Sequence, residues 1–132
     1  MKNLLVSLSL FLTFQSLLTA QDQTSLIVVQ AQLDAYNAQN IDDFAAVFAK
    51  DAEIFLNIGD KEPAMKGRNE IRERYGKMFR ENPSNKSTLM GRMVQGNFVI
   101  DHELITGREN TFRIIAVYEV EGQLIQRAWF VR

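Results

Sequence analysis

The chain of 132 residues contains no cysteine, one histidine and two prolines. Without cysteine it has neither a disulfide framework nor a site for lipid attachment. A single histidine leaves no credible set of zinc or iron ligands. No glycine-rich phosphate loop is present, because Gly59 and Gly67 stand alone, and no serine lies in a nucleophile elbow. We therefore predict that the protein carries no metal and no cofactor.

An excess of charge of one sign is also lacking. The sequence has 15 basic and 16 acidic side chains, a formal net charge of −1, and no basic run. This near-neutral balance argues against binding to nucleic acid and against a polybasic membrane surface. A chain of this length holds one domain with a sizeable core, so it needs no metal or disulfide to fold.

The one long hydrophobic run lies at the start of the sequence. Lys2 precedes a mostly apolar segment, residues 4–18, and Ala20 places a small residue at the end of it. This layout is typical of a secretory signal peptide, and polar residues interrupt the run too often for it to span a bilayer well. We expect residues 1–20 to be removed by cleavage near Ala20; the alternative is that they are retained as an N-terminal anchor. The domain over residues 21–132 is then periplasmic or secreted, in a bacterium, with no stable membrane insertion.

Three amphipathic patterns predict helices. Apolar residues recur at helical spacing over residues 26–36, behind a cap at Thr24 or Ser25. Asn40 caps a second, short helix, with two aspartates favourably placed in its first turn. The third pattern covers residues 68–82 and ends before a proline.

After these helices the pattern changes to the alternation of β-strands. Turn signals at residues 96–97, 107–110 and 121–122 separate four strands of an antiparallel meander. An earlier β-type run covers residues 53–58. Helices first and a meander afterwards indicate the α+β class, with the helices packed on one face of the sheet.

The last hairpin indicates which side chains share a face. A two-residue turn at residues 121–122 places Tyr118 opposite Ile125 and Ala116 opposite Arg127, with Trp129 on the same face. We predict that this face meets the helices. The opposite face is also fairly apolar, which predicts a homodimer through the outer side of the sheet.

The turn at residues 96–97 places the histidine. It pairs Arg92 with Asp101, and both with Glu103 are expected on the wet face, so that His102 points inward. A plain four-residue loop at residues 107–110 would instead put His102 on the outer face. The inward assignment therefore needs an odd-length loop or a bulge there, which a glycine can supply.

Two polar side chains would then face small neighbours, His102 across from Gly91 and Arg127 across from Ala116. A hollow lined by aromatic and a few polar groups is typical of a site for a small molecule. His102 is the one group whose ordinary pKa lies near neutrality, which makes it the candidate general acid or base. The alternative is a structural histidine satisfied by a neighbouring carboxylate.

Four further residues are candidates for ligand binding. Arg127 with Trp129 suits an anionic or carbonyl-bearing apolar ligand, and Tyr36 and Tyr118 can present hydroxyl groups to it. The structural alternatives are an ion pair between Arg127 and Glu53, and tyrosines that are core residues with their tips in water.

Several segments together resemble a known family. They are residues 33–42, 48–54 and 66–71 in the first half, and residues 99–103, 116–122 and 127–130 in the second. In these segments the chain resembles nuclear-transport-factor-2-like domains of the SnoaL-like subgroup, over nearly all of residues 21–132. The resemblance implies a cone: a bent sheet wrapped around a long helix, with a pocket at the open end, usually in a dimer.

The resemblance does not settle an activity, since relatives include ketosteroid isomerases, polyketide cyclases, epoxide hydrolases and proteins without chemistry. Matched without gaps, the isomerase's catalytic base falls on Leu56, its tyrosine on Gln32 and its oxyanion-hole aspartate near Ala116. All three groups are missing, so a copied isomerase mechanism is excluded. The sequence predicts a pocket for a small, mostly apolar molecule, with cofactor-free isomerase, cyclase or hydrolase activity as one outcome. The alternative is a non-catalytic binding or dimerisation module.

Overall fold

The computed structural model describes residues 18–132, and the predicted signal peptide lies mostly outside this part. No helix in residues 18–132 combines the length and the apolar character needed to cross a membrane. Export of the protein and removal of residues 1–20 stay predictions.

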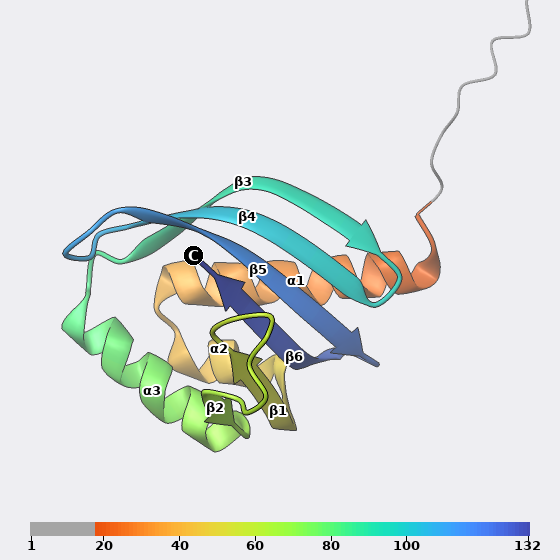
Figure 1. Ribbon diagram of the computed structural model, residues 1–132, viewed down its shortest axis with the longest axis horizontal. Coiled ribbons are helices and arrows are strands. Elements are labelled where there is room, and N and C mark those ends of the chain that lie inside the picture. The colour runs from red at the N-terminus through yellow and green to blue at the C-terminus, as the bar shows by residue number, and fades with distance from the viewer. Residues whose placement is uncertain (1–17) are drawn as a thin grey trace, which may run out of the picture.

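One bent, six-stranded sheet forms the frame of the domain, and it arches over the helices (Figure 1). Its strands are β1 (Phe48–Phe55), β2 (Met65–Lys66), β3 (Lys86–Gln95), β4 (Phe98–Thr106), β5 (Phe112–Glu121) and β6 (Leu124–Val131). Their order across the sheet is β2-β1-β6-β5-β4-β3, and all neighbours are antiparallel except β1 and β6. The predicted four-stranded meander is confirmed. The strand expected over residues 53–58 lies earlier in the chain, because β1 pairs along β6 from Phe48 onward.

The helices are α1 (Ala20–Ala38), α2 (Ile41–Ala46) and α3 (Arg68–Glu81), and they lie on the concave side of the sheet (Figure 1). The α+β class and the cone-like wrapping of the sheet around N-terminal helices are confirmed. Asn40 is the N-cap of α2, as predicted, and its side chain accepts a hydrogen bond from the amide of Asp43 at 3.1 Å. The first helix begins earlier than expected, because Thr19 and Asp22 form a reciprocal capping box.

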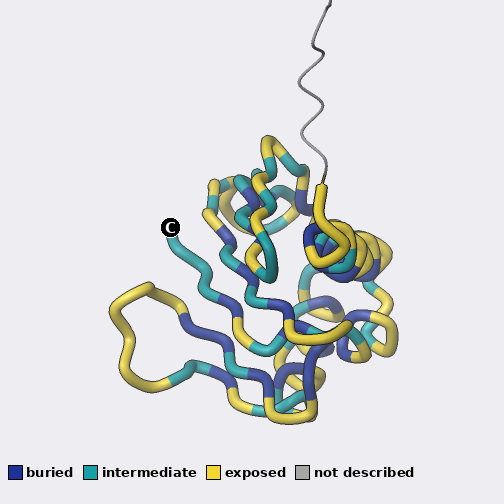
Figure 2. Tube along the Cα trace, turned by 90° about the vertical axis from the view of Figure 1, so that its right-hand side faces the viewer, coloured by how far each residue is buried: buried dark blue, intermediate teal, exposed yellow. Residues whose placement is uncertain are grey.

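The core lies between the helices and the concave face. Along the strands buried residues alternate with more exposed ones, which is the pattern of a sheet covered on one side (Figure 2). Aromatic rings of α1, α2, α3 and β1 pack together with centroids 4.4–6.4 Å apart; they belong to Tyr36, Phe44, Phe48, Tyr75 and Phe79. This cluster joins the three helices to one another and positions Tyr36 and Tyr75 for the site described below.

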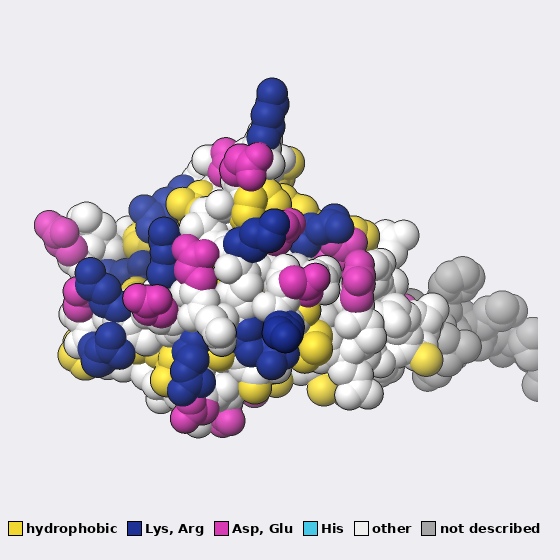
Figure 3. Space-filling model, turned by 90° about the horizontal axis from the view of Figure 1, so that it is seen from below, with side chains coloured by type: hydrophobic (Ala, Val, Ile, Leu, Met, Phe, Trp, Pro, Cys, Tyr) yellow, Lys and Arg dark blue, Asp and Glu magenta, His cyan; other side chains and the backbone are white. Residues whose placement is uncertain are grey.

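The exposed face of α3 carries charges of both signs (Figure 3). Arg74 lies 3.5 Å from Glu70 and Lys77 lies 3.8 Å from Glu81, each one helical turn apart. Exposed pairs of this kind contribute little to stability.

The convex face of the sheet carries exposed apolar side chains. Met93, Phe98 and Ile115 are more than a third exposed there. The homodimer expected through this outer face stays a prediction.

Candidate functional site

A cavity of about 430 Å³ lies between α1, α3 and the concave face of the sheet. Its wall is mostly apolar and aromatic, with a few polar and charged groups. The lining residues are Gln32, Leu33, Tyr36, Leu56, Asn57, Tyr75, Glu103, Ile105, Arg108, Phe112, Ile114, Tyr118, Phe130 and Arg132. This size and composition are those of a small-molecule site.

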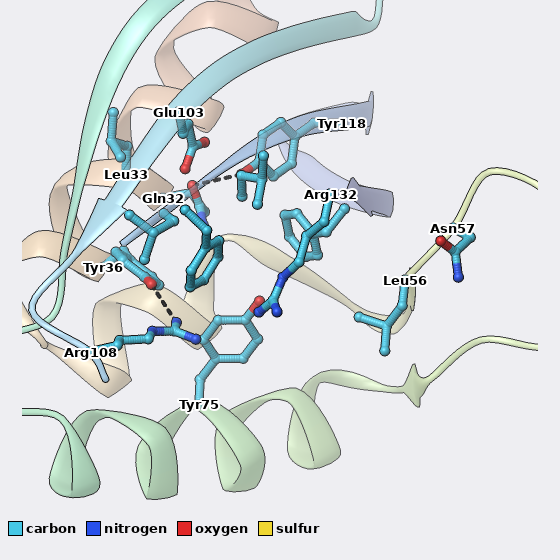
Figure 4. A pocket seen from close by; sticks show the side chains of 14 residues that line it. Gln32, Leu33, Tyr36, Leu56, Asn57, Tyr75, Glu103, Arg108, Tyr118 and Arg132 are labelled. Atoms are coloured by element: carbon cyan, nitrogen blue, oxygen red, sulfur yellow. Dashed lines mark hydrogen bonds between the residues drawn. The ribbon is translucent and has the colours of Figure 1, made fainter. Parts of the chain in front are cut away.

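Glu103 is the buried carboxyl group of the cavity. It lies on the inner face of β4 with 4% of its surface exposed. Ser87 on β3 donates a hydrogen bond to its Oε2 atom at 2.6 Å. The other oxygen, Oε1, is buried and has no hydrogen-bond partner among residues 18–132. One carboxyl oxygen is therefore held by the sheet while the other is left unpaired beside the cavity (Figure 4).

Burial raises the pKa of the Glu103 carboxyl above its ordinary value of 4.5, and the nearby negative charge of Asp101 adds to the rise. The hydrogen bond from Ser87, the charge of Arg92 and the nearby Tyr118 hydroxyl act in the opposite direction without cancelling it. The pKa is thus shifted toward the range in which a carboxyl group both accepts and releases protons near neutral pH.

Raising the pH is expected to destabilise the protein through Glu103. A carboxyl whose pKa rises on folding stabilises the fold below its unfolded pKa, and this contribution is lost as the pH passes upward through the folded pKa. Relative to Glu103→Gln, the wild type should lose up to about 1.4 kcal/mol of unfolding free energy for each pH unit in that window. Urea unfolding of both proteins across this pH range measures the difference, and parallel pH profiles would contradict the assignment.

Tyr118 and Gln32 lie beside Glu103 at the same end of the cavity (Figure 4). The Tyr118 hydroxyl, on the inner face of β5, donates a hydrogen bond to Oε1 of Gln32 on α1 at 3.4 Å. Burial, followed by the charge of Glu103, raises the pKa of Tyr118 well above its ordinary value. The phenol therefore stays protonated and is a hydrogen-bond donor at all physiological pH values.

Arg108 lies toward the other end of the cavity, in the loop between β4 and β5. Its Nε donates to Oδ1 of Asn85 at 2.6 Å, and its Nη2 donates to the hydroxyl of Tyr36 at 2.7 Å. The loop is held close to the segment before β3, since a side chain on Gly107 would overlap the carbonyl group of Ser84. This close approach and the positive φ of 76° at Gly107 both require glycine there. The turn thus places Arg108 over the cavity.

Arg132 completes this end of the cavity. Its guanidinium lies 4.0 Å from the ring centroid of Phe112, and that of Arg108 lies 5.6 Å from the same ring. The Tyr75 hydroxyl of α3 points toward the guanidinium of Arg132 (Figure 4). Acidic and cationic groups are therefore segregated at the two ends of one cavity.

Two of the predicted ligand-binding residues line the cavity, and the predicted catalytic residue does not. Tyr36 and Tyr118 are both in its wall. His102 pairs with Ile115 across β4 and β5, while its neighbours Asp101 and Glu103 are buried on the inner face. The ladder between β4 and β5 runs without a bulge, so the plain loop at residues 107–110 decides the face. The prediction that His102 points inward is wrong, and the expectation of a wet face for Asp101 and Glu103 is wrong with it.

Arg127 and Trp129 also lie on the outer face, contrary to the prediction. The turn is formed by residues 122–123, and a bulge follows in β6, so Arg127 pairs with Glu119 and Trp129 pairs with Val117. Glu119 lies 3.2 Å from the Arg127 guanidinium. Because the bulge adds one residue, it moves the rest of β6 to the opposite face.

The same bulge brings Phe130 and Arg132 inward, two cavity residues that the sequence interpretation missed. It also missed Glu103, although a signal was present. In the sequence analysis one cationic side chain, Arg92, was placed on the same face as two carboxylates, Asp101 and Glu103. In the structure Arg92 forms an ion pair with Asp101 alone. The second carboxylate is a surplus charge, and such a surplus on a covered face indicates a functional acid.

The three positions that the gapless match assigned to the isomerase's catalytic groups lie in or next to the cavity. Leu56 and Gln32 line the cavity, and Ala116 is fully buried beside it on β5. None of them carries an ionisable group, so the acid of this cavity comes from another position. Within residues 18–132, no three His, Cys, Asp or Glu side chains are grouped as metal ligands.

Comparisons with known proteins agree with this architecture. A family model for the SnoaL-like domain matches residues 29–128. An uncharacterized cystatin-fold protein from Novosphingobium aromaticivorans superposes with a TM-score of 0.76 and 26% identity, covering 82% of this chain and 97% of that one. Comparison with curated proteins found no match.

Two further structures share the fold at low identity. A provisionally assigned ketosteroid isomerase from Kribbella flavida has a TM-score of 0.70 and 17% identity, over 83% of this chain and 77% of that one. An LEH-like epoxide hydrolase from M. tuberculosis has a TM-score of 0.67 and 16% identity, over 83% and 82% of the two chains. At such identities the likeness shows the fold and leaves the chemistry to the site.

Proposed function

This chain belongs to the SnoaL-like domain family of the nuclear-transport-factor-2-like superfamily, and from that premise we propose that it binds a small, mostly apolar molecule in the cavity and moves a proton on it. The reaction class is the one that the sequence left open, a cofactor-free isomerase, cyclase or hydrolase. Glu103 takes the catalytic role that the sequence interpretation gave to His102.

The observation that carries this proposal is the unpaired oxygen of Glu103. A buried polar atom without a partner costs free energy, and a catalytic role or a group that binds there is among the explanations for one. Oε1 of Glu103 is of this kind, and its side chain lines a cavity large enough for a ligand. The raised pKa of the same group supports a role in proton transfer.

The surrounding groups define what each residue does. Glu103 takes a proton from a carbon next to a carbonyl group and returns it to the product, or takes it from water in a hydrolase. Tyr118, which stays protonated, donates a hydrogen bond to the substrate oxygen on which negative charge develops. The apolar wall excludes water and strengthens both interactions.

The competing hypothesis is a non-catalytic binding or dimerisation module. A dimerisation module would need only a filled core, whereas an acid beside a cavity of about 430 Å³ supports ligand binding and proton transfer. The names of the two low-identity neighbours, an isomerase and an epoxide hydrolase, fit the proposed class and carry no weight beyond the fold.

Native mass spectrometry tests the binding part of the proposal. After incubation with an extract of the producing cells, the protein is expected to retain a small molecule. Ile114→Trp, which fills the cavity from β5, should lose this adduct, whereas Ile115→Trp, on the adjacent outward position, should keep it. A wild-type protein that retains no molecule, or an Ile114→Trp variant that retains it fully, would exclude the cavity as a binding site.

A further inference from the structure

Two guanidinium groups meet around one aromatic ring at the end of the cavity away from Glu103. Arg132 lies 4.0 Å and Arg108 5.6 Å from the ring centroid of Phe112. Both side chains belong to the cavity wall, as does the ring between them. The two cations therefore border the same space, and the aromatic face holds them against it.

Neither cation is neutralised by a carboxylate in the described part of the chain. The ion pairs among residues 18–132 involve Arg72, Arg74, Arg92 and Arg127, together with two lysines. The partners of Arg108 are neutral: the amide oxygen of Asn85, the hydroxyl of Tyr36 and the sulfur of Met78. These contacts fix the orientation of the guanidinium without cancelling its charge.

The charge balance of the cavity is accordingly positive. Glu103 is the one acidic side chain among the lining residues, against two arginine side chains. Its burial disfavours the ionised form, so it compensates the arginines only in part. Like charges that border one space repel each other, and a carboxylate bound between them relieves this repulsion and accepts charge-assisted hydrogen bonds from both.

We infer that the cavity recognises the carboxylate of a small apolar acid, with Arg132 and Arg108 binding the carboxylate beside Phe112 and the rest of the molecule extending toward Glu103. This inference rests on the proposed function and names its substrate class. In the sequence analysis the binding of an anionic ligand was given to Arg127. The inference gives this role to Arg132 and Arg108, which lie on the inner side of the sheet.

The register of the sheet sets the orientation of the ligand. Ile105, opposite Phe112, lies two residues beyond Glu103 along β4, which corresponds to about 7 Å. A ligand must be at least this long to place its carboxylate at the arginines and its reacting carbon at the acid. The intervening wall, Ile105, Ile114 and Phe130, is apolar and suits a hydrocarbon or aromatic body.

The test compares two ligands of equal shape, 2-naphthoate and its neutral amide, 2-naphthamide, by isothermal titration calorimetry. The wild type is expected to bind the acid about tenfold or more tightly than the amide, the ratio expected for a charge-assisted hydrogen bond. Arg132→Gln should remove most of this preference and leave the affinity for the amide within about twofold. Any affinity tag precedes the domain, because Arg132 takes part in the site.

Arg113→Gln is the matched control. Arg113 is next to Phe112 on β5 but points to the opposite face and is exposed, so its replacement should change neither affinity. Equal binding of acid and amide by the wild type would overturn the carboxylate inference and leave the proposed function intact. An Arg132→Gln variant with the full preference for the acid would also overturn it. Binding of neither ligand to the wild type would count against both proposals.

Discussion

Glu103→Gln is expected to lower the rate of proton abstraction in the cavity by roughly 10²–10⁴-fold, the usual contribution of a positioned general base. The reaction is measured with 5-nitrobenzisoxazole, a neutral bicyclic carbon acid. A base removes its ring C–H proton, the electron pair of that bond forms the nitrile, and the N–O bond breaks to release a coloured phenolate. No cofactor is needed, and the difference in rate between the wild type and Glu103→Gln reports on the carboxylate.

The pH dependence distinguishes a catalytic Glu103 from a structural one. The reactive form is the carboxylate, and burial raises its pKa above the ordinary 4.5. The wild-type kcat/KM should therefore rise with pH through this raised pKa and level off above it, while Glu103→Gln should show no such rise. A structural role would lower the amount of folded protein without moving the pH profile of the remainder.

Glu119→Gln provides the matched control for this measurement. Glu119 is on the outer face of β5, where it pairs with Arg127, and it does not line the cavity. Its replacement is expected to keep the wild-type rate and the same pH profile. If Glu103→Gln retained the wild-type kcat/KM, Glu103 would not be the base.

Asp101→Ala is expected to destabilise the fold by about 3–5 kcal/mol, the range for removing one partner of a buried ion pair. Arg92 donates to both carboxylate oxygens of Asp101 at 2.6 and 2.7 Å. The side chain of Arg92 is 10% exposed and that of Asp101 is fully buried. Removing the carboxylate leaves the guanidinium with Gln30 as its remaining hydrogen-bond acceptor. Urea unfolding of the wild type and the variant measures the loss.

The double replacement Arg92→Met with Asp101→Leu identifies the cause. If the loss comes from an uncompensated buried charge, replacing both partners by apolar side chains should restore most of the stability. Arg74→Ala, which removes an exposed pair with Glu70 on α3, should cost about 0–1 kcal/mol. A double variant as unstable as Asp101→Ala would show that shape rather than charge is responsible.

The ion pair also connects the stability of the sheet to the site. Asp101 and Glu103 are two residues apart on β4 and share the inner face. Arg92 neutralises the first and leaves the second unpaired. The negative charge of Asp101 contributes to the raised pKa of Glu103, so Asp101→Ala should lower that pKa as well.

Local sequence signals were sufficient for the three helices, the four-stranded meander and the fold class. The apolar spacing of residues 68–82 predicted α3, Asn40 predicted the start of α2, and the turn at residues 96–97 predicted the pairing of Arg92 with Asp101. These features depend on residues a few positions apart, whose side-chain hydrogen bonds and steric limits act within one segment. Tyr36 and Tyr118 were placed correctly on the inner side for the same reason, since each lies in a regular stretch of its element.

Only the tertiary structure determined which face of each strand points toward the helices. The bulge in β6 and the unbroken ladder between β4 and β5 depend on how six strands pair and bend over α1. A shift of one residue exchanges the two faces of a strand. The structure therefore has Arg132 in the cavity wall in place of the predicted Arg127, and Glu103 in place of the predicted His102. The helices, the meander and the family could be predicted from the sequence because each depends on patterns within short segments. The identity of the acid and of the cations was settled by long-range pairing, whose energy no single segment contains.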